Sequence, residues 1–364
     1  MQNGIERVLI YRLGSLGDTV VALPCFHQVA RAYPNAERCL LTNIPVHSKA
    51  PGAFSVLEGS GLVHSFMRYP VATRSLGELI TLQRQIRAYR AQVLVYLTPR
   101  RMAGEVLRDA AFFRLCSIPQ IVGLPLARDA RTNRLDAETE SYEPEAARLA
   151  RLMRGLGEID LDDAANWDLG LTLDEHRRAA EVLEPVQGRP LLACSVGTKV
   201  QAKDWGQENW RRVLDILAAE LPQFGLVLIG ANEESSVSKS AADAWAGRSV
   251  NLCGRLAPRE SAAVLVRARL FLGHDSGPMH LAAAVGTPCV PVFSARNRPR
   301  TWFPFGSQHE VIYHRTDCWG CDLETCIEQK KKCLTSILPA EVLGAVHRVL
   351  ARISLARSIV IGSQ

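Results

Sequence analysis

The chain has 364 residues with a formal net charge of +6, and 47% of its residues are hydrophobic and 22% charged. This length suits two globular domains of about 150 to 200 residues each, and the composition is that of an ordinary globular protein. The modest positive charge permits an anionic substrate or a membrane surface but does not single out nucleic acid. No RNA-binding motif or zinc-finger spacing supports a nucleic-acid partner. No uncharged apolar window is long enough for a membrane span, and the N-terminus enters a strand without the apolar core of a signal peptide, so we expect a cytoplasmic protein.

The first half predicts strands separated by helices. Residues 75–90 place apolar side chains at helical spacing between apolar runs, and such alternation favours right-handed crossovers and a mainly parallel sheet. The strands we expect are 7–11, 37–43, 92–98 and 120–125.

The second half repeats this pattern after a charged, alanine-rich stretch at 138–187. Its expected strands lie within 189–198, 224–234, 249–255, 269–277 and 287–294, and a last helix covers 340–353. We predict an α/β protein of two doubly wound domains facing across a cleft, with ligands beyond the carboxyl ends of the strands. The predicted boundaries are 1–175, 176–338 and, for the final helix, 339–364.

The loop after the first strand reads "RLGSLGDTVVALP". Its spacing, Gly14-x-x-Gly17-Asp18, is not the G-x-G-x-x-G of a dinucleotide fold, and neither half contains that motif, which disfavours an NAD-dependent dehydrogenase. Glycines let this turn approach a ligand. Asp18 either caps the following helix or meets a ligand as a carboxylate.

The stretch "FLGHDSGPMHLAAAVG" predicts a helix that begins after a strand and ends at a glycine. Asp275 or Ser276 can cap this helix, and Gly277 allows close approach of another backbone. The helix start favours a phosphate, and His280 in the first turn points toward the same opening. Taken singly, Asp275 is explained as a helix cap and His280 as a buried histidine. Together, after a strand of the second half, these residues favour an anion site.

Two other strand-to-helix loops carry polar groups suited to a nucleotide. Hydroxyl and ammonium groups after a strand can donate to phosphate oxygens. Lys203, beside Trp205, is the better candidate, because Lys199 alone is accounted for as an exposed residue of a solvated loop. Gly230 permits a later turn, where Glu233 or Glu234 either accepts from ribose hydroxyls or is surface charge. The first of these loops supplies the candidates Ser195, Gly197, Thr198 and Lys203.

Arginines of the first half could bind acceptor carboxylates or phosphates through their planar guanidinium groups. Arg100 and Arg101 follow a strand and are the stronger candidates, and Arg68 is a weaker one. For each of the three, an ordinary surface arginine is about as common as an acceptor ligand. The cluster Cys318, Cys321, Cys326 and Cys333 can ligate a metal, but its spacing favours packed or redox-labile thiols. The lysines at 330–332 could contact anionic lipid, although such a run is more often solvated.

The segments "RLGSLGDTVVALP", "KDWGQENW" and "HDSGPMHLAAAVGTPCVPVF" together resemble glycosyltransferase family 9, the heptosyltransferases that build the inner core of lipopolysaccharide. The likeness covers roughly residues 6–351. Ser276 stands where the family often has threonine, and Gly206 where it often has proline.

The resemblance implies a GT-B fold of two Rossmann-like domains, with acceptor on the first, nucleotide-sugar on the second, and the last helix crossing back to the first. It implies an inverting reaction without metal or cofactor, with ADP-L-glycero-D-manno-heptose as donor and Asp18 as general base. Lys203 and the start of the helix at 277–280 would then compensate the charge of the leaving diphosphate. Two alternatives are a GT-B enzyme with another nucleotide-sugar or acceptor, and a nucleotide-binding protein without activity.

Overall fold

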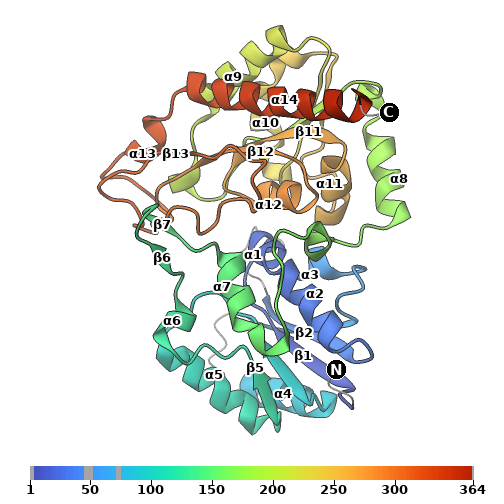
Figure 1. The fold of residues 1–364 in the computed structure, drawn as a ribbon, viewed down its shortest axis with the longest axis vertical. Helices are drawn as coiled ribbons and strands as arrows, with labels where there is room; N and C mark the ends of the chain where they lie inside the picture. The colour runs from blue at the N-terminus through green and yellow to red at the C-terminus, as the bar shows by residue number, and fades with distance from the viewer. Residues whose placement is uncertain (1–3, 45–51, 71–74, 363–364) are drawn as a thin grey trace. The chain divides into compact units, whose positions relative to one another are not determined.

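The computed structural model describes residues 4–44, 52–70 and 75–362, and side chains as far as residue 355. The chain forms two compact units, Met1–Leu171 and Thr172–Gln364, so the second unit begins slightly before the predicted boundary at 175. Both units are α/β and built on parallel sheets, as predicted (Figure 1).

The first unit is built on a five-stranded parallel sheet in the order β3-β2-β1-β4-β5, which is the doubly wound order. All four predicted strands are confirmed. The fifth strand, β3, escaped prediction because its side chains are half-buried or exposed, so no apolar run marks it. The strands are β1 (Arg7–Tyr11), β2 (Glu37–Ile44), β3 (Ser65–Pro70), β4 (Val93–Tyr96) and β5 (Gln120–Val122).

Helices of the first unit bury apolar faces against this sheet. Leu82 and Ile86 of α4 and Phe113 of α5 pack with Leu9 and Leu94 of the strands into one core. The single helix expected after β1 is instead two, and a proline stands in the first turn of the second, where its missing N–H costs nothing. The helices are α1 (Leu16–Val21), α2 (Leu23–Ala32), α3 (Phe54–Leu57), α4 (Leu76–Tyr89), α5 (Ala103–Leu115), α6 (Arg128–Arg131) and α7 (Glu145–Leu152).

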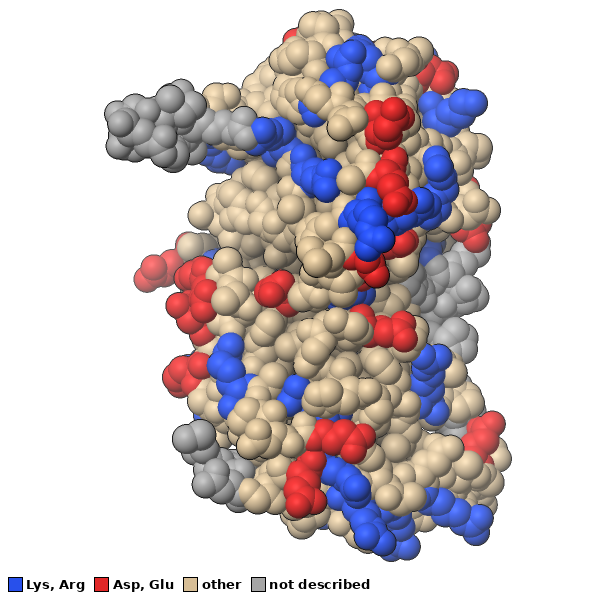
Figure 2. Space-filling view, turned by 90° about the vertical axis from the view of Figure 1, so that its right-hand side faces the viewer, with Lys and Arg blue, Asp and Glu red and all other residues tan. Residues whose placement is uncertain are grey.

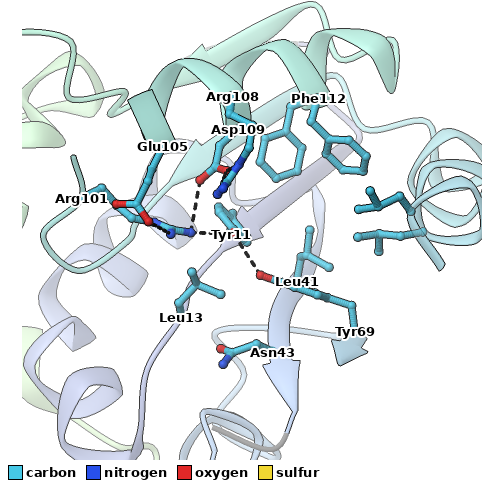
Figure 3. A pocket seen from close by; sticks show the side chains of 13 residues that line it. Tyr11, Leu13, Leu41, Asn43, Tyr69, Arg101, Glu105, Arg108, Asp109 and Phe112 are labelled. Atoms are coloured by element: carbon cyan, nitrogen blue, oxygen red, sulfur yellow. Dashed lines mark hydrogen bonds and ion pairs between the residues drawn. The ribbon is translucent and has the colours of Figure 1, made fainter. Parts of the chain in front are cut away.

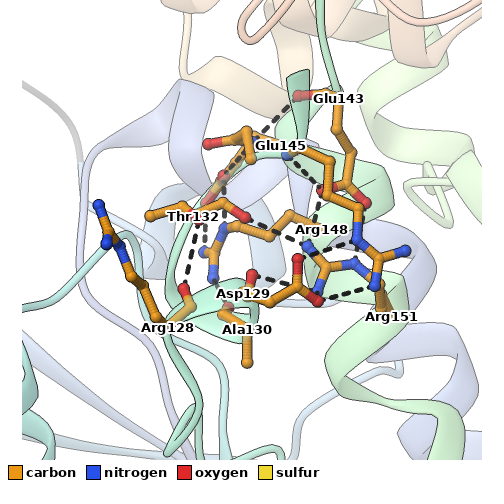
Figure 4. A network of polar contacts seen from close by, with 10 residues as sticks. Arg128, Asp129, Ala130, Thr132, Glu143, Glu145, Arg148 and Arg151 are labelled. Carbon is orange, nitrogen blue, oxygen red and sulfur yellow. Dashed lines mark hydrogen bonds and ion pairs between the residues drawn. The ribbon is translucent and has the colours of Figure 1, made fainter. Parts of the chain in front are cut away.

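Charged side chains near residue 140 form a polar network (Figure 4). It connects α6 and a short hairpin to α7, and the hairpin consists of β6 (Leu135–Asp136) and β7 (Ser141–Tyr142). Arg151 binds Glu143 at 2.7 Å and Asp129 at 3.3 Å. Arg148 and Glu145 form a buried pair, with Nε to Oε2 at 2.8 Å. Burial without these partners would be costly, so the charges hold the segment in one arrangement.

The second unit contains a six-stranded parallel sheet in the order β10-β9-β8-β11-β12-β13. Its five predicted strands are confirmed, and the short edge strand β13 is added. Trp210, Leu214 and Leu217 of α9 pack on strand residues such as Leu228 and Leu272. The strands are β8 (Leu191–Ser195), β9 (Gly225–Leu228), β10 (Ser249–Asn251), β11 (Ala268–His274), β12 (Cys289–Phe293) and β13 (Ile312–Tyr313).

The last helix, α14, extends beyond the predicted 340–353 and packs on α9, β11 and β12 of its own unit through Val342, Val346 and Val349 (Figure 1). Its contact with the first unit stays a prediction. The helices of the second unit are α8 (Leu173–Val182), α9 (Gln207–Glu220), α10 (Ser235–Ala241), α11 (Pro258–Leu265), α12 (Gly277–Ala284), α13 (Lys332–Thr335) and α14 (Pro339–Gly362).

Two surface properties bear on the predicted partners. Among the described residues, no helix is both long enough and apolar enough to pass through a membrane. On the face drawn in Figure 2, Lys and Arg side chains are interspersed with Asp and Glu.

Candidate active site

The turn between β1 and α1 holds Asp18 in a defined position. Ser15 is the N-cap of α1, and Asp18 Oδ2 accepts hydrogen bonds from Ser15 N at 2.7 Å and Ser15 Oγ at 2.8 Å. Asp18 therefore takes part in a cap, though from the third helical position. No residue of the described ranges donates to its Oδ1, which leaves one carboxylate oxygen for another proton donor.

Gly14 is required by the approach of Asp18. Its φ is +119°, and a Cβ there would lie 2.5 Å from Asp18 Cβ and 2.8 Å from Oδ2. Any other side chain would therefore displace the carboxylate. Gly17, the second glycine of the motif, is buried in the first turn of α1.

Arg12 lies beneath this turn and was not recognised from the sequence. It is fully buried, and its guanidinium donates to Leu97 O at 3.1 Å and to the main-chain carbonyl of Asp18. Burial lowers the pKa of Arg12. The only sequence signal for Arg12 was its position directly after a buried strand. Its role in fixing the Asp18 turn also depends on β4, because Arg12 donates to Leu97 O, which follows that strand.

The three predicted acceptor arginines have different surroundings. Arg68 lies on β3 over the ring of Phe54, 4.2 Å from its centroid, and Arg100 is exposed. Arg101 binds side chains of its own unit: Glu105 at 2.9 Å, Asp109 at 3.2 Å and the hydroxyl of Tyr11 at 3.2 Å. An acceptor anion at Arg101 would compete with these partners.

Arg101 also lines a cavity of about 550 Å³ at the carboxyl ends of β1, β2 and β3 (Figure 3). This is the edge at which doubly wound sheets bind ligands. Helices α4 and α5 form its other walls. The lining residues are Tyr11, Leu13, Leu41, Asn43, Tyr69, Leu79, Leu82, Arg101, Glu105, Arg108, Asp109, Phe112 and Phe113.

The second unit places its predicted residues at the corresponding edge of its sheet. Ser195, Gly197 and Thr198 end or follow β8, Gly230 follows β9, and Asp275 follows β11. These three strands are neighbours in the order β9-β8-β11, so the loops gather at one edge.

An ion pair joins two of these loops. Lys203 Nζ lies 2.6 Å from Asp275 Oδ2, which also accepts from Asn297 Nδ2 at 2.8 Å. Asp275 is buried, while Lys203 keeps 18% of its side chain exposed. The carboxylate thus holds the ammonium group at the edge of the sheet, on a side chain that is partly exposed.

His274 joins the same loops from below and was not predicted as a site residue. Its Nε2 accepts from Trp205 N and from Trp210 Nε1, both at 3.0 Å, so the neutral ring carries its proton on Nδ1. Burial lowers the pKa of His274 to about 4. The only sequence signal for His274 was its position at the end of an apolar run.

The start of α12 has the features of an anion site. Ser276 is its N-cap, and the buried Oγ of Ser276 has no hydrogen-bond partner among the described residues. Gly277 begins the helix, and His280 is buried with its ring edge-on to Trp302 at 6.5 Å. Asp275 is therefore not the cap; it holds Lys203 instead.

The structure distinguishes the two glutamates that follow β9. Glu233 is exposed, whereas Glu234 lies against two glycines of the candidate site. A Cβ at Gly197 would lie 2.2 Å from Glu234 Cδ, and one at Gly230 would lie 2.4 Å from Glu234 Oε2. Burial raises the pKa of Glu234, whose carboxylate accepts from Ala231 N at 2.8 Å.

Gly206, which stands where the resembled family often has proline, is the N-cap of α9 with a φ of +104°. Proline cannot adopt this angle, because its ring fixes φ near about −65°. A proline at this position would therefore require a different local backbone.

The four clustered cysteines line one small cavity beside Ser294 and Arg296, with Cys321 exposed and Cys333 buried. Within the described ranges, no group of three or more His, Cys, Asp or Glu side chains is placed to hold a metal ion. Of the neighbouring lysines, Lys331 donates to Asp204 O at 2.7 Å and Lys332 pairs with Asp317. These two ammonium groups bind their own unit, and a membrane role of the run stays a prediction.

Comparisons with known proteins identify the family of the chain. Residues 82–332 match the sequence model of glycosyltransferase family 9 (heptosyltransferase). Lipopolysaccharide heptosyltransferase 3 of Escherichia coli K12 is 28% identical over 150 residues, covering 41% of this chain and 43% of that protein. The chain matches less than half the length of the first curated relatives.

Solved structures share the fold over nearly the whole chain. The glycosyl transferase family 9 protein from Veillonella parvula has a TM-score of 0.70 and 19% identity, covering 97% of this chain and 99% of that one. E. coli heptosyltransferase WaaC, solved with ADP-2-deoxy-2-fluoro heptose, has a TM-score of 0.61 and 18% identity, with coverages of 95% and 99%.

Proposed function

The chain belongs to glycosyltransferase family 9, and from this premise we propose that it transfers a heptose from ADP-L-glycero-D-manno-heptose to a hydroxyl of the lipopolysaccharide inner core. The proposal includes inversion at the anomeric carbon and chemistry without a metal. It assigns the acceptor to the first unit and the donor to the second. It places the enzyme in the cytoplasm, with peripheral contact at the inner membrane.

The observation that carries the proposal is the Lys203–Asp275 pair beside the start of α12. Main-chain N–H groups at a helix start and a held ammonium group are donors suited to a diphosphate. Ser276 adds a hydroxyl without a partner among the described residues. A diphosphate that leaves with growing negative charge would be stabilised by these groups in the transition state.

The nucleoside part of the donor is assigned to the edge formed by Gly197 and Gly230. Glu234 lies against both glycines and could accept hydrogen bonds from ribose hydroxyls. The adenine nucleotide is supported by the related WaaC structure, which contains an ADP-heptose analogue.

Asp18 is assigned as the general base. Its Oδ2 is held by Ser15, which fixes the direction of the carboxylate, and Oδ1, which accepts no hydrogen bond from the described residues, would face the acceptor hydroxyl. The carboxylate would take the hydroxyl proton as the oxygen attacks the anomeric carbon and the bond to the diphosphate breaks. A base must lie within hydrogen-bond reach of its proton, and Gly14 removes the side chain that would obstruct Asp18.

The test is a donor screen that measures nucleotide release from ADP-, GDP-, UDP- and dTDP-sugars with a heptose-deficient lipopolysaccharide core as acceptor. We expect acceptor-dependent release of ADP from the heptose donor, unchanged by EDTA. Release from another nucleotide alone would support a different donor. Binding of ADP without transfer to any acceptor would contradict the proposed activity.

A further inference from the structure

We infer that the cavity bounded by α4, α5 and the carboxyl ends of β1, β2 and β3 binds an uncharged, mainly apolar group of the acceptor (Figure 3). The inference deepens the proposed function, because it specifies which kind of acceptor the first unit selects. It does not depend on the identity of the donor sugar.

The size and walls of the cavity fit an organic ligand. Its volume of about 550 Å³ lies within the range of small-molecule sites, which are mostly apolar with a few polar groups. Most of its lining side chains are apolar or aromatic and come from both helices and the strand ends. These are Tyr11, Leu13, Leu41, Tyr69, Leu79, Leu82, Phe112 and Phe113.

The charged side chains of the cavity neutralise one another. Arg101 pairs with Glu105 at 2.9 Å and with Asp109 at 3.2 Å, and Arg108 pairs with Asp109 at 2.9 Å. The two guanidinium groups and the two carboxylates cancel, so the cavity wall has no net charge that would attract an ionic ligand. A phosphate or carboxylate would have to separate a pair that is partly buried, which is unfavourable.

Two polar atoms in this wall remain unsatisfied. Asn43 Oδ1 and Arg101 Nε are buried and have no hydrogen-bond partner within the described residues. Both atoms belong to residues that line the cavity, and an unpaired buried polar atom is costly. The hydroxyls of Tyr11 and Tyr69 are 3.0 Å apart, and burial raises the pKa of both, so they stay neutral.

The cavity adjoins the candidate base along the chain. Leu13 lines the cavity, and the next residue, Gly14, is in close contact with the side chain of Asp18. A ligand whose apolar group fills the cavity would therefore lie beside the turn that holds Asp18.

The test is isothermal titration calorimetry of the full chain with three probes. We expect saturable binding of n-octyl β-D-glucoside below its micelle concentration, none of methyl β-D-glucoside, and at least about tenfold weaker binding of sodium octyl sulfate. Equal binding of the anionic probe, or no binding of octyl glucoside, would overturn the inference.

Two matched pairs of variants place the binding. Leu79→Trp should fill the cavity and weaken octyl glucoside binding about tenfold or more, while Ile80→Trp, at an exposed neighbour in α4, should not. Phe112→Ala should likewise weaken binding and Leu115→Ala, exposed on α5, should not. Equal effects within both pairs would place the probe elsewhere.

Parallel measurements separate this inference from the proposed function. ADP titration and nucleotide release are recorded on the same samples, with thermal unfolding as the check on folding. Heptose transfer without octyl glucoside binding would refute only the apolar cavity. Octyl glucoside binding without any transfer would refute only the proposed reaction.

Discussion

The two units carry side chains of contrasting charge at the same edge of a doubly wound sheet. In the first unit, the charges of Arg101, Glu105, Arg108 and Asp109 cancel around an apolar cavity. In the second, Lys203 is held at a helix start beside a hydroxyl that has no partner among the described residues. Doubly wound folds bind ligands at this edge, and the comparison shows that the surrounding loops, rather than the sheet, set the local charge.

The comparison is tested most strongly by Asp18→Asn. The amide oxygen can still accept from Ser15, so the turn should persist, but the base is lost. We expect heptose transfer to fall about 10²- to 10⁴-fold while ADP binding to the second unit is unchanged. Calorimetry with ADP is the control, and full transfer by a folded Asp18→Asn enzyme would exclude Asp18 as the base.

Lys203→Met should affect the other unit. Loss of a charged hydrogen bond to the diphosphate should weaken ADP binding and slow transfer, each by about 10- to 100-fold, and should leave octyl glucoside binding unchanged. Lys239→Met, at an exposed lysine of α10, is the matched control. If both variants bind ADP like the parent chain, Lys203 is not a phosphate ligand.

Gly14→Ala and Gly206→Ala compare two glycines with positive φ. Both substitutions strain the backbone by roughly 1 to 3 kcal/mol, because residues with a side chain rarely adopt these angles. Only Gly14 faces the carboxylate of Asp18, so only Gly14→Ala should also reduce kcat, by about tenfold or more. Urea unfolding and initial rates measure the two effects, and equal rates for both variants would show that the Asp18 contact is unimportant.

Acid should weaken the second unit through two buried histidines. Burial lowers the pKa of His274 and of His309 from 6.5 to about 4. Below pH 6.5 the unfolded chain takes up protons that the folded chain does not, so stability falls as pH drops toward about 4. Each histidine contributes at most about 1.4 kcal/mol per pH unit.

This pH dependence is checked by urea unfolding across that range. His309 accepts from Cys289 N and donates to Phe305 O, a bonding pattern that fixes the neutral ring. His309→Gln should flatten the dependence, because it removes one of the two buried imidazole rings. An unchanged slope in His309→Gln would contradict the assignment.

Much of the site could be predicted from the sequence because strand ends are local signals. The apolar runs placed Asp18, Ser195, Gly230 and Asp275 in loops after strands, and parallel sheets bring such loops to one edge. The roles within those loops could not be predicted. Asp275 holds Lys203 rather than capping α12, and this depends on the neighbouring order of β8 and β11.

The alternation of apolar runs and helical spacing by itself determined two parallel α/β units and the loops that carry their polar groups, because hydrophobic periodicity is a property of the chain. Only the tertiary structure decided which side chains meet: Glu234 rather than Glu233 against the glycines, Arg12 beneath Asp18, and Arg101 against two carboxylates. These contacts join residues from different strands or helices or depend on how a turn folds back, and their distances are set by packing rather than by sequence spacing.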